Sequence, residues 1–212
     1  MVGPSRRERR ASGITWRRAD AHDSPFPDVS FDAIVCQFGL MFVPDKARAF
    51  SEKRRVLRAR EQLAFSIWCS LAENPLGRIA RDTIARYFTS NPPDFYEVPF
   101  SFHDEWLIRE PLAVAQFGQV SCERVVLVAQ SASTRDAVCG LVTGNPTVLD
   151  VVERATASPD EIVAAVAAAL TAECDGATLR LPMRALVVVP MRPDTMAPYF
   201  CRAFPEASAL EI

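Results

Sequence analysis

The stretch "RRADAHDSPFPDVSFDAIVCQFGLMFVPD", residues 17–45, decides the fold of this chain. It predicts a short strand at 14–18, then a turn rich in Asp, Pro and Ser, then a second strand. That second strand, "FDAIVCQF" at 31–38, is almost continuously apolar, as expected for a strand covered on both faces. Strands of this kind usually hold a small ligand at their carboxyl ends, so residues 38–45 should border a cleft.

The next segments extend this pattern into a strand–helix–strand unit. Asp45 can cap a helix, and Ala47, Phe50, Val56 and Leu57 form an apolar stripe along it. The sequence "QLAFSIWCS" at 62–70 predicts the following buried strand. A right-handed crossover would make the two strands parallel, which indicates an α/β sheet.

The remaining chain predicts helices separated by two further strands. The expected helices cover 74–88, 104–117 with Pro111 inside and Gly118 as the stop, 133–142, 147–155 and 158–174. The expected strands cover 122–130 and 183–190, and 191–212 has no regular pattern.

Composition indicates an ordinary globular protein of 212 residues, enough for one core with an appended subdomain. A net charge of −2 gives no reason to expect nucleic acid or a membrane surface as partner. Six cysteines without a C-x-x-C pair predict reduced thiols in a cytoplasmic protein, and two histidines argue against a histidine-rich metal site. The longest helical apolar run, 162–170, is too short to span a bilayer, and we expect no secretion signal.

The ordered series from "ADAHDSPFPDVSFD" through "CQFGLMFVPD" to "LAFSIW", residues 19–68, resembles the class I S-adenosylmethionine-dependent methyltransferases that act on small molecules. The similarity extends over residues 14–190. It implies a Rossmann-like α/β fold, with a mixed sheet in the order 3-2-1-4-5-7-6 and helices on both faces. It also implies a helical cap over the acceptor, formed by about 74–103 and 131–180.

The resemblance assigns the cofactor S-adenosylmethionine to specific residues. Asp20 would accept a hydrogen bond from the adenine amino group, and the backbone of Ala21 would meet the ring edge. Cys36, Gln37 and Phe38 would pass beside the methionine and the sulfonium. Three of these residues have a structural alternative: Asp20 as a turn residue, Gln37 as a surface amide and Phe38 as core.

The resemblance also implies an acceptor side, where Phe42 and His103 would face a small, partly hydrophobic methyl acceptor. His103 is the one candidate general base outside the adenine loop. The structural alternatives are a core position for Phe42 and a helix-start position for His103. No metal is expected, because the sulfonium already carries an activated methyl group.

The sequence departs from the family pattern in two places. The first two strands and the G-x-G-x-G turn between strand and helix are missing, so the fold is expected to be N-terminally truncated. Residues 1–13 then form only a basic remnant before the domain at 14–190 and the tail at 191–212. Ala59, Arg60 and Glu61 stand where the family has Pro-Gly-Gly, so that turn must be rebuilt or the helix extended.

Without its usual neighbours, the 31–38 strand should lie exposed at the edge of the sheet. Three consequences are open: a homodimer or swapped assembly, a collapse of the 14–18 strand onto the 31–38 strand, or a poorly soluble fragment. The function expected is small-molecule methyl transfer in the cytoplasm. The alternative is a non-catalytic module or fragment that assembles through this edge. A nicotinamide-dependent dehydrogenase is disfavoured, because no G-x-G-x-x-G follows a strand.

Overall fold

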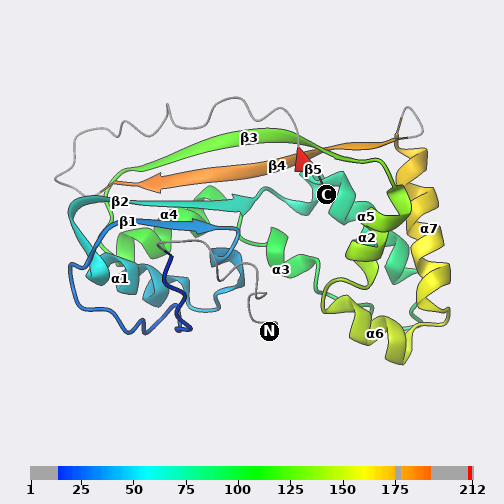
Figure 1. Ribbon diagram of the computed structural model, residues 1–212, viewed down its shortest axis with the longest axis horizontal. Helices are drawn as coiled ribbons and strands as arrows, with labels where there is room; N and C mark the ends of the chain where they lie inside the picture. The colour runs from blue at the N-terminus through cyan, green and yellow to red at the C-terminus, as the bar shows by residue number, and fades with distance from the viewer. Residues whose placement is uncertain (1–13, 175–177, 192–209, 212) are drawn as a thin grey trace.

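The computed structural model describes residues 14–174, 178–191, 210 and 211. Its strands form one sheet in the order β1-β2-β4-β3-β5 (Figure 1). The strands are β1 (Phe31–Gln37), β2 (Leu57–Trp68), β3 (Val120–Ser131), β4 (Leu179–Pro190) and β5 (Leu210–Glu211). The helices are η2 (Leu40–Phe42), α1 (Lys46–Val56), η3 (Leu71–Glu73), α2 (Pro75–Ala85), α3 (Glu97–Phe100), α4 (Glu105–Val114), α5 (Thr134–Val142), α6 (Thr147–Arg154) and α7 (Pro159–Ala172).

The unit β1–α1–β2 forms as the sequence predicts. The Asp45 carboxylate caps α1 by accepting the backbone N–H of Arg48 at 2.9 Å. The helix returns the chain so that β1 and β2 pair in parallel, with Ile34 opposite Leu63 and Gln37 opposite Ser66. This pairing brings the carboxyl ends of the two strands side by side.

The other strands make the sheet mixed, as expected. β4 lies antiparallel to β2 and to β3, while β5 pairs in parallel with β3 over two residues. The order β1-β2-β4-β3 corresponds to strands 4-5-7-6 of the fold that the resemblance implies.

Helices cover both faces of the sheet, which confirms that expectation. Leu63 and Phe65 of β2 and Val188 of β4 pack with α1 and α4, whereas Leu181 and Met183 of β4 pack with α2, α5 and α7. Alternate residues of a strand point to opposite faces, and the β4 register is unbroken, so these two cores lie on opposite sides. Figure 1 shows α1 and α4 beside β1 and β2, with α2, α5 and α7 gathered at the other end.

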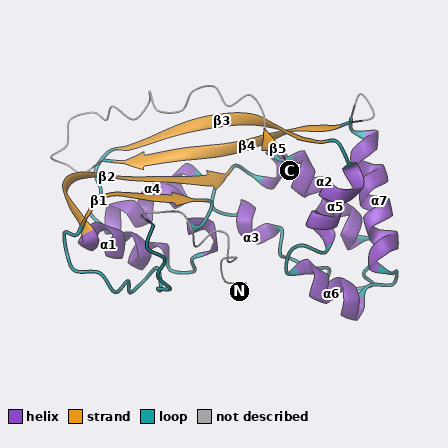
Figure 2. Cartoon of the chain, in the orientation of Figure 1, coloured by secondary structure: helices purple, strands orange, loops and turns teal. Residues whose placement is uncertain are grey.

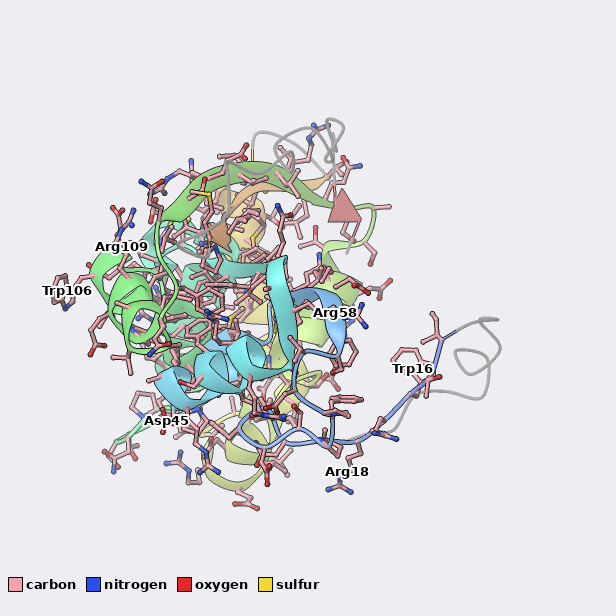
Figure 3. All side chains as sticks on the ribbon, turned by 90° about the vertical axis from the view of Figure 1, so that its left-hand side faces the viewer. Trp16, Arg18, Asp45, Arg58, Trp106 and Arg109 are labelled. Carbon is pink, nitrogen blue, oxygen red and sulfur yellow. The ribbon has the colours of Figure 1, made fainter. Side chains whose placement is uncertain are left out.

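The expected strand at 14–18 is wrong. These residues have no regular structure, and their side chains are exposed, with Trp16 57% exposed. Figure 3 shows Trp16 and Arg18 on an extended segment that leads away from the sheet. A strand needs a hydrogen-bonded neighbour, and within the described ranges the segment has none. The collapse of this segment onto β1 does not occur either.

The turn between α1 and β2 is rebuilt, and the helix is not extended through it. This is the first of the two outcomes expected from the missing Pro-Gly-Gly. Strand β2 begins at Leu57, directly after α1, so Ala59 lies within a strand and not in a turn. The ladder shifts register here, because Phe31 pairs with Leu57 and Ala33 with Gln62. A bulge of this kind absorbs extra residues without glycine.

Several expected boundaries hold and others move. Asp104, Ser133 and Ser158 cap α4, α5 and α7 as predicted. Helix α4 contains Pro111 but ends at Val114, and the left-handed residue after it is Gln116 (φ 61°), so the stop at Gly118 was placed too late.

Residues 1–13 and most of 191–212 lie outside the described residues, and the domain division stays a prediction. No helix in the described ranges is both long and apolar enough to cross a membrane.

Candidate cofactor and acceptor site

The carboxyl end of β1 makes a sharp turn. Phe38 is left-handed (φ 50°), and its N–H donates to the Ser66 carbonyl at 3.0 Å and lies 3.3 Å from the Ser66 hydroxyl oxygen. Next in the chain, a Cβ at Gly39 would lie 2.9 Å from the Cys36 sulfur. A larger residue there would require the Cys36 side chain or the turn to shift, so glycine allows this close approach.

Three aromatic rings continue from this turn into the cap. The Phe38 ring stacks on Trp68 with centroids 4.1 Å apart, and Trp68 lies 6.2 Å from Phe100 of α3. Figure 2 shows α3 beyond the carboxyl ends of β1 and β2. The rings form an apolar wall at the place where the fold family holds its ligand.

The three residues expected beside the sulfonium point in different directions. Cys36 packs toward the core shared with α1 and α4, while the neighbouring Gln37 is exposed. Phe38 is half-buried against Trp68. Gln37 is therefore the exposed residue of these three.

Asp20 lies in a tight turn that His22 closes. The Asp20 Oδ1 atom accepts both the backbone N–H and the Nδ1–H of His22, each at 2.8 Å. These two hydrogen bonds, the backbone one first, hold the pKa of Asp20 below its ordinary value, so the carboxylate is ionised at neutral pH. The side chain remains 66% exposed.

The Asp20 turn lies close to the first turn of α1. The positive charge of Arg48 contributes to lowering the pKa of Asp20, which places the two side chains in the same electrostatic environment. Arg48 is the third residue of α1, and α1 begins shortly after the turn at Phe38.

An ion-pair cluster holds the loop after this turn on α1. The Glu52 carboxylate accepts the N–H and the hydroxyl of Ser24 at 2.8 and 2.7 Å. Arg55 donates to Glu52 at 2.6 Å, to the Phe26 carbonyl at 3.0 Å and to Asp28 at 2.5 Å. The Arg55 guanidinium lowers the pKa of Glu52 to about 2, and Ser24 adds to this effect.

The two acceptor-side candidates lie on neighbouring segments. Phe42 belongs to η2 and is 50% exposed, so it is not a core residue. η2 contacts α3, and His103 follows α3 by three residues. The Nδ1 atom of His103 donates to the Phe100 carbonyl at 2.7 Å, which leaves its Nε2 atom as an acceptor. Asp104, not His103, caps α4.

Sequence reasoning missed several residues that shape this region. Ser66 and Glu52 contact it from segments far along the chain, and a sequence pattern does not reveal such pairs. His22 was visible only as a histidine two residues after Asp20, a spacing that allows a local side-chain bond. The described part of the chain contains no cluster of His, Cys, Asp and Glu suited to a metal ion.

Comparisons with known proteins agree with this architecture. A family model described as "Methyltransferase domain" matches residues 1–65. The chain is 36% identical over 87 residues to a demethylmenaquinone methyltransferase of Thermobifida fusca, covering 38% of this chain and 37% of that protein. It is 47% identical over 45 residues to a 2-phytyl-1,4-naphtoquinone methyltransferase of Synechococcus elongatus, covering 21% and 19%.

The YcgJ protein of Bacillus subtilis shares the fold, with a TM-score of 0.53 at 15% identity, covering 90% of this chain and 75% of that one. The family model and the relatives support a class I S-adenosylmethionine-dependent methyltransferase. This confirms the recognition made from residues 19–68, and S-adenosylmethionine as the cofactor that the family implies. The chain spans less than two fifths of the length of the two curated relatives named above.

The described residues fit one end of this cofactor. Asp20 keeps its Oδ2 atom without a hydrogen-bond donor from any described residue, and the adjacent Ala21 N–H has no acceptor there. An acceptor beside a donor complements the adenine edge, whose amino group donates and whose N1 atom accepts. The part of the chain that the structure describes has no glycine between 14 and 38, and we identify no partner for the ribose there.

Replacing Glu52 by Gln should loosen the loop from Asp20 to Asp28. It should also remove a pH-dependent part of the free energy of unfolding. The depressed pKa of Glu52 contributes stability that is present above its ordinary value of 4.5 and is lost as the pH falls toward 2. Since Arg55 is partly exposed, we expect Glu52→Gln to lower the free energy of unfolding by roughly 2 kcal/mol at pH 7.

Urea unfolding at pH 7 and at pH 3 measures this effect. Glu52→Gln should lower the unfolding midpoint at pH 7 and change less between the two pH values than the wild type. The exposed Glu153→Gln serves as control. Equal midpoints for both variants at pH 7 would contradict the anchoring role of Glu52.

Proposed function

We propose that this chain takes part in transferring a methyl group from S-adenosylmethionine to a small, partly apolar molecule. The observation that carries the proposal is the free acceptor and donor pair at Asp20 and Ala21, in a chain whose fold resembles that of methyltransferases. Asp20 would accept the adenine amino group and Ala21 would donate to the ring. Gln37 and Phe38 would line the methionine side, and Cys36 would support them from the core.

The acceptor side is proposed to lie between η2 and the start of α4. Phe42 offers an exposed ring, and the Nε2 atom of His103 can accept a proton from a nucleophile. Two relatives carry names of demethylmenaquinone and phytyl-naphthoquinone methyltransferases, which supports a ring compound of the quinone class as the acceptor. A cytoplasmic location stays a prediction.

The chain's own residues would bind, orient and exclude water. S-adenosylmethionine supplies an activated methyl group when bound, so the main task of the protein is to align the acceptor. The half-buried Phe38 ring stacks on the half-buried Trp68, and this pair would contact a flat acceptor, with the buried Phe100 supporting Trp68 from the core.

Asp20→Asn tests the proposal, with S-adenosylhomocysteine titrated into each protein in a calorimeter. Asparagine still accepts the His22 N–H through its oxygen but offers an amide donor to the adenine amino group. Loss of a charge-assisted hydrogen bond predicts affinity weaker by roughly tenfold or more. The control is Asp23→Asn, which removes a carboxylate from the same turn.

Two results would contradict the proposal. Unchanged affinity in Asp20→Asn would remove Asp20 from the cofactor site. A wild-type chain that folds but releases no heat of binding would show that this chain alone does not hold the cofactor.

A second candidate is assembly through β1, by a homodimer or a swapped arrangement. In the described part of the chain β1 pairs only with β2, and its Val35 side chain is 70% exposed. An exposed apolar edge strand favours pairing with another chain.

Sedimentation velocity at increasing protein concentration tests this candidate. A self-associating wild type should become monomeric in Val35→Lys, because a lysine on an edge strand opposes pairing. Val152→Lys on α6 is the control, since Val152 is 67% exposed but distant in sequence from the edge. A monomeric wild type at all concentrations would exclude the assembly.

A further inference from the structure

His22 donates a second hydrogen bond to Asp20, beyond the one that closes the turn. Its backbone N–H already closes the turn on the Asp20 Oδ1 atom at 2.8 Å. Its ring adds a second bond to the same oxygen, also at 2.8 Å. Both donors fall on Oδ1, so Oδ2 is the oxygen that remains available.

The ring itself is held by burial. The His22 side chain is only 17% exposed, and its Nε2 atom is buried without a hydrogen-bond partner in the structure. Because a carboxylate oxygen only accepts, the Nδ1 atom that faces it is the donor of this bond. The packing therefore fixes the direction of the Nδ1–H bond and, through it, the plane of the carboxylate.

A competing partner for the carboxylate lies nearby. Arg48 is exposed, and its charge acts on Asp20, but no hydrogen bond joins the two side chains. A carboxylate held by only the backbone bond could rotate and pair with this guanidinium. Such a pair would occupy the oxygen that an adenine amino group needs.

We propose that His22 is a positioning residue that locks the Asp20 carboxylate with Oδ2 presented to a purine amino group, and so makes the site selective for adenine over a 6-oxo purine. This inference rests on the proposed function of Asp20. The fixed Oδ2 attracts an amino donor and repels the carbonyl oxygen of hypoxanthine. Selectivity of this kind depends on a fixed acceptor, because a mobile carboxylate can turn away from the wrong base.

The test compares S-adenosylhomocysteine with S-inosylhomocysteine, which differ only at position 6 and the adjoining ring nitrogen. Calorimetry gives the affinity ratio for the wild type, His22→Leu and His22→Asn. The wild type should prefer the adenine compound by tenfold or more. His22→Leu should reduce this preference to below threefold, because the ring donor is lost.

His22→Asn is the conservative rescue. Its amide nitrogen is attached to Cγ as Nδ1 is in histidine, so it can donate to the same oxygen and should restore most of the preference. A purely structural role of His22 would weaken both ligands equally and leave their ratio unchanged. If His22→Leu does not fold, the His22→Asn variant tests the inference in its place. Loss of the preference for the adenine compound in a folded His22→Asn variant would overturn the inference.

The outcomes separate this inference from the proposed function. If Asp20→Asn leaves binding unchanged, the adenine role of Asp20 fails and the inference fails with it. If Asp20→Asn weakens binding but His22→Leu keeps the full preference for adenine, the cofactor site stands and only the positioning role of His22 is overturned.

Discussion

The parallel pairing of β1 with β2 is the constraint on which the candidate site depends. It places the Phe38 N–H on Ser66 and brings Phe38 against Trp68, which defines the turn at the end of β1. The crossover helix α1 also carries Glu52 and Arg55, which hold the loop that begins at Asp20. One ladder and one helix therefore place both the adenine candidate and the strand end.

Features fixed by local chemistry could be predicted from the sequence. The Asp45, Asp104 and Ser158 caps depend on bonds within four residues. The nearly continuous apolar run of β1 predicted a strand covered on both faces, but Val35 is 70% exposed, so that expectation is wrong for one face. The segment 14–18 has the composition of a strand but lacks a neighbour, and composition does not reveal this. The junction at Ala59 likewise depends on a register shift against β1.

Only part of the candidate site could be predicted from the sequence. Asp20, Ala21 and the run 36–38 follow from an ordered motif, and α1, which follows the turn at Phe38, also holds the loop after Asp20. The direction of each side chain does not follow, because Cys36 and Gln37 alternate across the strand and only Gln37 is exposed. The second bond from His22 to Asp20 depends on ring burial, which only the folded loop defines.

Mapping S-adenosylhomocysteine onto the chain by backbone amide chemical shifts in nuclear magnetic resonance tests the central claim most directly. The account predicts that the largest shifts fall on the amides of Ala21 and His22 and on the turn at Phe38 and Gly39, two segments joined only through α1. Shifts confined to α5, α6 and α7, or to one of the two segments alone, would contradict a single site built on the β1–β2 ladder.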